Sequence, residues 1–121
     1  MTNELKLKKC NICGRIVEVK DDEPVICCGQ EMVDVIPNSV DAAVEKHVPT
    51  YERVEDEIYV KVNHVMEKEH YIEWLTMVAN GETTKVELFP EQEASARFKY
   101  VKGAKLYAYC NKHGLWTTDV E

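Results

Sequence analysis

Apolar and polar residues alternate through much of the chain beyond residue 50, in the pattern typical of half-buried β-strands. Ile58, Val60 and Val62 give the clearest case, because they would share one face of a strand. Another strand is predicted over 70–79, and the Asn80-Gly81 that follows it is typical of a two-residue hairpin turn. The other predicted strands are 51–54, 57–62, 84–89, 96–100, 105–110 and 115–120. About seven short strands of this kind predict an immunoglobulin-like β-sandwich.

The first part of the chain has a different pattern, with only short apolar stretches. Brief strands are predicted around 6–9, 15–20 and 25–27, with a turn at Asp21-Asp22-Glu23-Pro24. The turn-forming cluster Pro37-Asn38-Ser39 marks the expected boundary between two domains, 1–37 and 38–121. A unit of fewer than about 40 residues rarely folds alone, so a metal or oligomerisation is expected to support the first domain.

Composition and charge narrow the class of protein. The 121 residues are 45% hydrophobic and 31% charged, which is typical of a folded domain. The net charge of −7 argues against nucleic acid and against an anionic membrane surface as partners. No signal peptide is visible, and no apolar run approaches the roughly 18 residues of a spanning helix. We therefore expect a cytoplasmic protein, in which clustered cysteines remain reduced and more often bind metal.

Four of the five cysteines lie in the first domain. Cys10 and Cys13 form a Cys-x-x-Cys pair, and the adjacent Cys27 and Cys28 complete a set of four thiolates. Such a set makes a closed tetrahedral site for zinc or iron, which the two adjacent cysteines are expected to distort. A structural zinc ribbon is the first interpretation of this spacing. A redox dithiol would need only Cys10 and Cys13, and leaves the other pair unexplained.

The four histidines all lie in the second domain. His47 is on an irregular segment entering a strand, since the nearby Pro49 favours extended backbone before it. His64 and His70 would lie about 240° apart on a helix, but they can converge across a loop. Taken one at a time, such histidines are usually ordinary surface or core residues, and that interpretation stays open.

Cys110 and His113 are spaced so that one turn can hold both side chains on one metal. Cys110 shares a strand face with Leu106 and Ala108, so it is expected to point where apolar side chains point. A catalytic thiol with His113 as its base is the alternative, and it would leave the other histidines without a role. The nearby strand residues Trp74, Leu75, Leu115 and Trp116 are expected to fill the core.

Taken together, these segments resemble superoxide reductase of the two-iron kind, desulfoferrodoxin. The resemblance covers nearly the whole chain, and its segments occur in the family's order. The segments are Cys10-x-x-Cys13 with Cys27-Cys28, Glu45-Lys46-His47-Val48-Pro49, His64-x-Met66-x-x-Glu69-His70-Tyr71-Ile72-Glu73-Trp74, and Cys110-Asn111-x-His113-Gly114-Leu115-Trp116.

The resemblance implies a small desulforedoxin-like metal-binding domain followed by an immunoglobulin-like catalytic domain, in a homodimer. It implies two irons per chain. One would be an FeS4 centre at the four N-terminal cysteines, where zinc stays an alternative. The other would have four histidines in a plane, an axial thiolate and an open sixth position. Its ligands would be His47, His64, His70, Cys110 and His113.

The implied reaction is the one-electron reduction of superoxide to hydrogen peroxide, which serves detoxification under oxidative stress. The implied electron donor is rubredoxin, which makes the protein part of an electron-transport chain. Lys46 would attract superoxide, and Glu45 would bind ferric iron after turnover.

The sequence departs from the family's pattern at three points. Val65 replaces a common proline, Lys112 replaces a common apolar residue, and the gap from Cys13 to Cys27 is short. Two other functions stay open at this point. They are a non-enzymatic zinc ribbon with a β-sandwich that binds a protein, and a simple electron-transfer iron protein.

Overall fold

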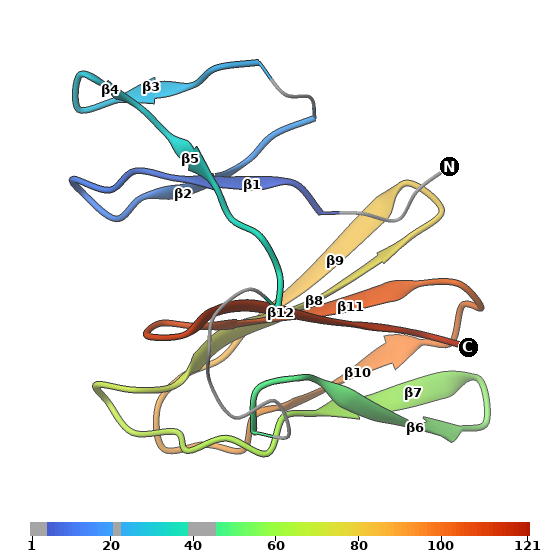
Figure 1. Ribbon diagram of the computed structural model, residues 1–121. Coiled ribbons are helices and arrows are strands. Elements are labelled where there is room, and N and C mark those ends of the chain that lie inside the picture. The colour runs from blue at the N-terminus through green and yellow to red at the C-terminus, as the bar shows by residue number, and fades with distance from the viewer. Residues whose placement is uncertain (1–4, 21–22, 39–45) are drawn as a thin grey trace. The chain divides into compact units, whose positions relative to one another are not determined.

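The structure is a computed structural model that describes residues 5–20, 23–38 and 46–121 (Figure 1). The chain divides into two compact units, with the boundary between Ile36 and Pro37. Within the described ranges, no helix is both long and apolar enough to span a lipid bilayer.

The N-terminal unit is built from very short antiparallel strands. Its described buried apolar residues are few: Leu5, Leu7, Cys10 and Met32. A three-stranded sheet has the order β2-β1-β5, and β3 pairs with β4 in a separate hairpin. The strands are β1 (Leu7–Lys9), β2 (Ile16–Glu18), β3 (Ile26–Cys27), β4 (Gln30–Glu31) and β5 (Val33–Asp34). The sequence analysis does not predict β4 and β5, which have two residues each, whereas β3, equally short, falls within the predicted 25–27. The predicted turn at 21–24 begins with Asp21 and Asp22, which lie outside the described residues.

The C-terminal unit confirms the predicted sandwich of seven strands. One antiparallel sheet has the order β10-β7-β6, and the other has the order β12-β11-β8-β9. The strands are β6 (Thr50–Val54), β7 (Glu57–Lys61), β8 (Ile72–Ala79), β9 (Glu82–Glu87), β10 (Ser95–Lys99), β11 (Lys105–Cys110) and β12 (Gly114–Asp119). The predicted hairpin between β8 and β9 is present, with Asn80 and Gly81 both at positive φ.

The core of the sandwich forms where the inward faces of the two sheets meet. Ile58 and Val60 of one sheet and Leu75 and Leu106 of the other are 1% exposed or less and belong to one cluster. Burying a side chain of this size stabilises the fold by roughly 1.5–3 kcal/mol. Cys110 is 0% exposed and belongs to the same cluster, so the expected orientation of its thiol is confirmed.

A β-bulge interrupts the pairing of β8 with β11 near the start of β8. Trp74 pairs with Tyr109, but Cys110 pairs with Ile72, so that Glu73 is the extra residue. Without the bulge, Glu73 would face the core beside Cys110; with it, the fully buried Ile72 takes that place. The strand predicted over 70–79 therefore begins two residues later, at Ile72, and His70 lies in the loop before it.

Candidate metal centres

The ends of strands in one sheet bring two of the histidines together. His47 lies shortly before β6, and His64 follows β7. Because β6 and β7 are antiparallel and Thr50 pairs with Lys61, the segment before β6 and the segment after β7 lie at the same end of the sheet. The ring centroids of His47 and His64 are 4.7 Å apart.

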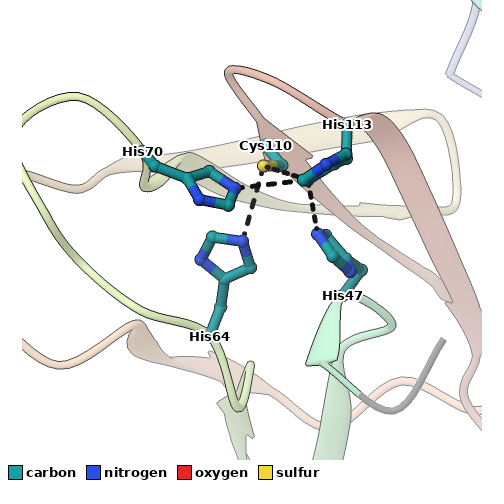
Figure 2. A group of neighbouring side chains, drawn as sticks. All are labelled: His47, His64, His70, Cys110 and His113. Carbon is teal, nitrogen blue, oxygen red and sulfur yellow. Dashed lines mark hydrogen bonds between the residues drawn. The ribbon is translucent and has the colours of Figure 1, made fainter. Parts of the chain in front are cut away.

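The other sheet supplies the remaining three donors at the same end of the sandwich. Cys110 is the last residue of β11 and pairs both with Ile72 of β8 and with Gly114 of β12. His70 therefore enters from the loop before β8, and His113 from the turn before β12. Figure 2 shows the four imidazoles and the thiol turned toward a common space, and one donor atom of each lies within 4.8 Å of all the others.

The donor atoms lie as close together as ligands of one metal ion do. His113 Nδ1 lies 3.0 Å from His47 Nε2, 3.2 Å from His70 Nε2 and 3.7 Å from Cys110 Sγ. Cys110 Sγ is also 3.5 Å from His64 Nε2. A single ring nitrogen has one proton or one lone pair, so it cannot satisfy three such neighbours by hydrogen bonding. A metal ion among them would use every donor, and a set of imidazoles and one thiolate suits iron, zinc or copper.

The surroundings of His64 and His70 favour the neutral form of these two imidazoles, which is the form that binds metal. Burial lowers the pKa of His64 below its ordinary value, and the neighbouring His47 and His70 add to the effect. Burial likewise lowers the pKa of His70, together with repulsion from His113 and Lys112. Protons therefore compete weakly for these two rings at neutral pH.

Trp116 supports two of the histidines from within the core. It is 1% exposed, its ring stacks on His47 at 5.0 Å between centroids, and its Nε1–H donates to the carbonyl of His113 at 3.1 Å. The sequence predicted Trp116 only as a core residue and missed these contacts. The sequence held no signal for these contacts, because they follow from the pairing of Trp116 with Ala108, which shares the face of Cys110. Trp74, also predicted as core, is only partly buried and stacks on Tyr109.

Four further residues singled out near the site from the sequence are Glu45, Lys46, Val65 and Lys112. Lys46 is exposed and directly precedes the buried His47. Glu45 lies outside the described residues. Lys112 is exposed beside His113, and Val65 is 50% exposed between the two loop histidines.

The four N-terminal cysteines form a second cluster. One sulfur atom of each lies within 4.8 Å of all the others, and none is in a disulfide. The Cys10-x-x-Cys13 turn is closed by a hydrogen bond from Gly14 N–H to Cys10 O at 2.9 Å, with Gly14 at a φ of 79°. Cys13 N–H also points to Cys10 Sγ at 3.5 Å.

A tight hairpin explains how two adjacent cysteines both reach this cluster. Cys27 is the last residue of β3 and pairs with Gln30, so Cys28 and Gly29 form a two-residue turn. Both turn residues have positive φ, of 54° and 74°, as in a type I′ turn. Holding a non-glycine residue such as Cys28 in this region costs on the order of 1–3 kcal/mol. Placing two adjacent cysteines, Cys27 and Cys28, in the cluster therefore strains the backbone at Cys28.

The thiols of the cluster differ in pKa because each has different hydrogen-bond partners. Hydrogen bonds from the backbone N–H groups of Cys13 and Ile12 lower the pKa of Cys10 to about 6. Hydrogen bonds with Cys13 and Cys10 raise the pKa of Cys27 to about 12. The same two neighbours raise the pKa of Cys28. The Cys10 thiol thus loses its proton first, while Cys27 and Cys28 hold protons that a cation bound among the four sulfurs would displace. The set suits zinc or iron.

Comparison with known proteins finds matches named desulfoferrodoxin or superoxide reductase. The family model described as Desulfoferrodoxin matches residues 39–119. A desulfoferrodoxin of Syntrophotalea carbinolica is 42% identical, over 98% of this chain and 99% of that protein. A desulfoferrodoxin homolog of Archaeoglobus fulgidus is 40% identical, over 96% of this chain and 98% of that protein. The crystal structure of the superoxide reductase from Treponema pallidum matches with a TM-score of 0.74 at 28% identity, over 95% of this chain and 98% of that one.

Proposed function

Because this chain belongs to the desulfoferrodoxin family, we propose that it reduces superoxide to hydrogen peroxide at an iron centre in the sandwich. Each turnover would consume one superoxide, one electron and two protons, and would release one hydrogen peroxide. The observation that carries the proposal is the convergence of five nitrogen and sulfur donors from both sheets. The proposed ligands are His47, His64, His70, Cys110 and His113.

When bound, iron supplies the one-electron redox chemistry. The chain contributes neutral imidazoles that leave the positive charge of the metal uncancelled, and one thiolate that donates electron density to it. Cys110 is fully buried, so its sulfur is shielded from water and from oxidants in solution. Five protein donors leave room for one small further ligand on a six-coordinate ion.

Local positive charge is the second part of the proposal. The net charge of −7 repels an anionic substrate at long range. Lys46 and Lys112 are both exposed, and each directly precedes a proposed ligand, His47 or His113. The charge of Lys112 is felt at His70, where it lowers the pKa of the ring. We propose that Lys46 attracts superoxide to the centre, that Lys112 adds to this field, and that Glu45 binds the ferric iron after turnover.

The remaining assignments concern the rest of the chain. We propose that 1–37 and 38–121 act as separate domains, and that Cys10, Cys13, Cys27 and Cys28 hold a second iron or a zinc. A homodimer, a rubredoxin electron donor and a cytoplasmic location complete the proposal. Each of them is what the resemblance to the family implies.

Metal analysis followed by pulse radiolysis of the reduced protein tests the function. We expect iron in the protein, a visible spectrum that changes on oxidation with ferricyanide, and a fast second-order reaction with superoxide that yields peroxide. Zinc alone in a colourless protein would instead support a non-enzymatic binding module. Iron that does not react with a superoxide pulse would support a simple electron carrier.

A further inference from the structure

Asn111 lies in the turn between Cys110 and His113, and its side chain is aimed at neither. Its Nδ2–H donates to the carbonyl of Glu69 at 3.0 Å, and its Oδ1 accepts from the N–H of Tyr71 at 3.1 Å. The backbone N–H of Asn111 also donates to the carbonyl of Tyr71, at 3.2 Å. Glu69 and Tyr71 are the two neighbours of His70, so these bonds hold the chain on both sides of that histidine.

The side chain continues a strand ladder that the backbone cannot continue. Regular pairing of β11 with β8 ends at Cys110 and Ile72, because the chain then turns toward His113. A primary amide offers a carbonyl acceptor and two N–H donors, so its oxygen and one N–H can bond side by side to the same stretch of backbone. The Asn111 amide therefore supplies, from one side chain, the acceptor and the donor that two separate backbone groups of a longer β11 would offer to the chain before β8.

His70 depends on this substitute because its own backbone is already used. Its N–H donates to the carbonyl of Glu67 at 3.1 Å, and its carbonyl accepts from the N–H of Glu67 at 3.0 Å. These two bonds close a small turn within the loop and tie His70 to nothing outside it. Within the part of the chain that the structure describes, the Asn111 side chain joins this turn to the segment of Cys110 and His113.

We propose that Asn111 is a positioning residue that fixes His70 relative to Cys110 and His113. The inference rests on the proposed function, in which these three residues bind the same iron. Cys110 and His113 belong to one tight turn, and Asn111 makes His70 move with that turn as one unit. Groups that orient a metal ligand from outside typically change metal affinity or activity by roughly 10- to 100-fold when they are removed.

Two variants of Asn111 separate its two hydrogen bonds. Asn111→Ala removes both side-chain bonds and keeps the backbone bond, whereas Asn111→Asp keeps the acceptor for Tyr71 and places a carboxylate oxygen against the carbonyl of Glu69. In the iron-loaded protein, we expect Asn111→Ala to lower iron affinity by roughly 10- to 100-fold. We also expect both variants to shift the reduction potential and the EPR spectrum of the sandwich iron. Wild-type values of all three in both variants would overturn the proposal.

Asn38 provides a control, because its side-chain amide makes a comparable pair of hydrogen bonds elsewhere, with the N–H and the carbonyl of one residue. Its Oδ1 accepts from the N–H of Thr117 at 2.9 Å, and its Nδ2–H donates to the carbonyl of Thr117 at 3.5 Å. Asn38 has a φ of 58°, so Asn38→Ala adds backbone strain to the lost bonds and should lower the melting temperature at least as much as Asn111→Ala. We expect its iron potential and EPR spectrum to remain those of the wild type. The same spectral change in Asn38→Ala would show that the effect of Asn111→Ala follows from a general loss of stability, and it would overturn the proposal.

Hydrogen exchange at the Tyr71 amide tests the contact without relying on iron. In the protein as purified, Asn111→Ala should speed this exchange by about tenfold, as loss of one hydrogen bond worth about 1.4 kcal/mol predicts. Asn111→Asp should retain most of the protection. If the wild type bound no iron in the sandwich, the proposed function would fail, but the exchange rate would still decide whether Asn111 holds the His70 segment. Unchanged exchange in Asn111→Ala would refute that role.

Discussion

The two donor clusters are built in opposite ways. The four cysteines come from two tight turns close together in sequence, in a unit with few buried apolar side chains. The five donors of the sandwich come from the ends of four strands and a turn, and they stand on a core that the two sheets form by themselves. We infer that the first cluster needs its metal in order to exist, whereas the second is assembled before its metal arrives.

Removal of all metal gives the largest expected difference between the two units. In the N-terminal unit we expect loss of the strands, because its short strands and few buried residues leave metal binding as a main source of folding energy. In the sandwich we expect retained strands, because its core does not include the metal. Amide hydrogen exchange measured by NMR before and after chelation would report on each unit separately. Equal protection of both units in metal-free protein would contradict the comparison.

Replacement of one sulfur in each cluster tests whether the clusters are independent. We expect Cys110→Ser to lower the rate with superoxide by more than the roughly 100-fold typical of an outer contact, because the thiolate itself is lost. It should leave the absorption of the four-cysteine centre intact. Cys13→Ser should do the reverse, disturbing that absorption and sparing the reaction. Full reductase activity in Cys110→Ser would refute the assignment of the sandwich centre.

Substitution of Lys46 tests the role of local charge at the sandwich site. We expect Lys46→Ala to lower the second-order rate with superoxide by about tenfold and to weaken its dependence on ionic strength, as for other steered encounters. Lys99→Ala changes the net charge by the same amount on β10 and serves as the control. Pulse radiolysis over a range of salt concentrations measures both. Equal rates for the two variants would remove Lys46 from the mechanism.

Trp116 offers a smaller test of how the core supports the histidines. Trp116→Phe keeps an aromatic ring against His47 and loses the Nε1–H bond to His113, at an expected cost of about 0.5–1.5 kcal/mol in stability. We expect a small shift in the reduction potential of the sandwich iron and no change at the four-cysteine centre. Potentiometric titration followed at the absorption of each centre measures both. A shift at the four-cysteine centre would show that the clusters are coupled.

The smallest expected effect lies on the surface of the sandwich. Lys61 and then Tyr59 lower the pKa of Glu93, whose carboxylate lies 2.9 Å from the ammonium of Lys61 and accepts from the hydroxyl of Tyr59 at 3.0 Å. The stabilisation is therefore present above the unfolded pKa of about 4.3 and is lost as the pH falls through the lower folded value. We expect the wild type to exceed Glu93→Gln slightly in stability at pH 6, and the two to converge in acid. Urea unfolding at several pH values measures the difference, and a constant difference down to pH 2 would contradict it.

The sequence predicted those features that depend on local pattern. Alternation located the seven sandwich strands, and spacing grouped the four N-terminal cysteines, since tight turns bring such residues together. The five donors of the sandwich were assigned through the family resemblance. It could not locate the bulge at Glu73, because an extra residue in one strand is defined only by its partner strand. The stacking of Trp116 on His47 and the bonds of Asn111 to the His70 loop depend likewise on tertiary contacts. The left-handed backbone of Cys28 was also unexpected, since cysteine rarely occupies that position in a turn.

The bulge in β8 also constrains how this site could be moved to another protein. One supernumerary residue decides whether a carboxylate or a branched alkane lies beside the thiol of Cys110. The number of residues between His70 and β8 therefore sets not only the length of the connection but also which side chains face the core. Grafting the donors onto a regular hairpin would keep every ligand but would turn Glu73 toward the core. A graft must therefore include the β-bulge along with the ligands.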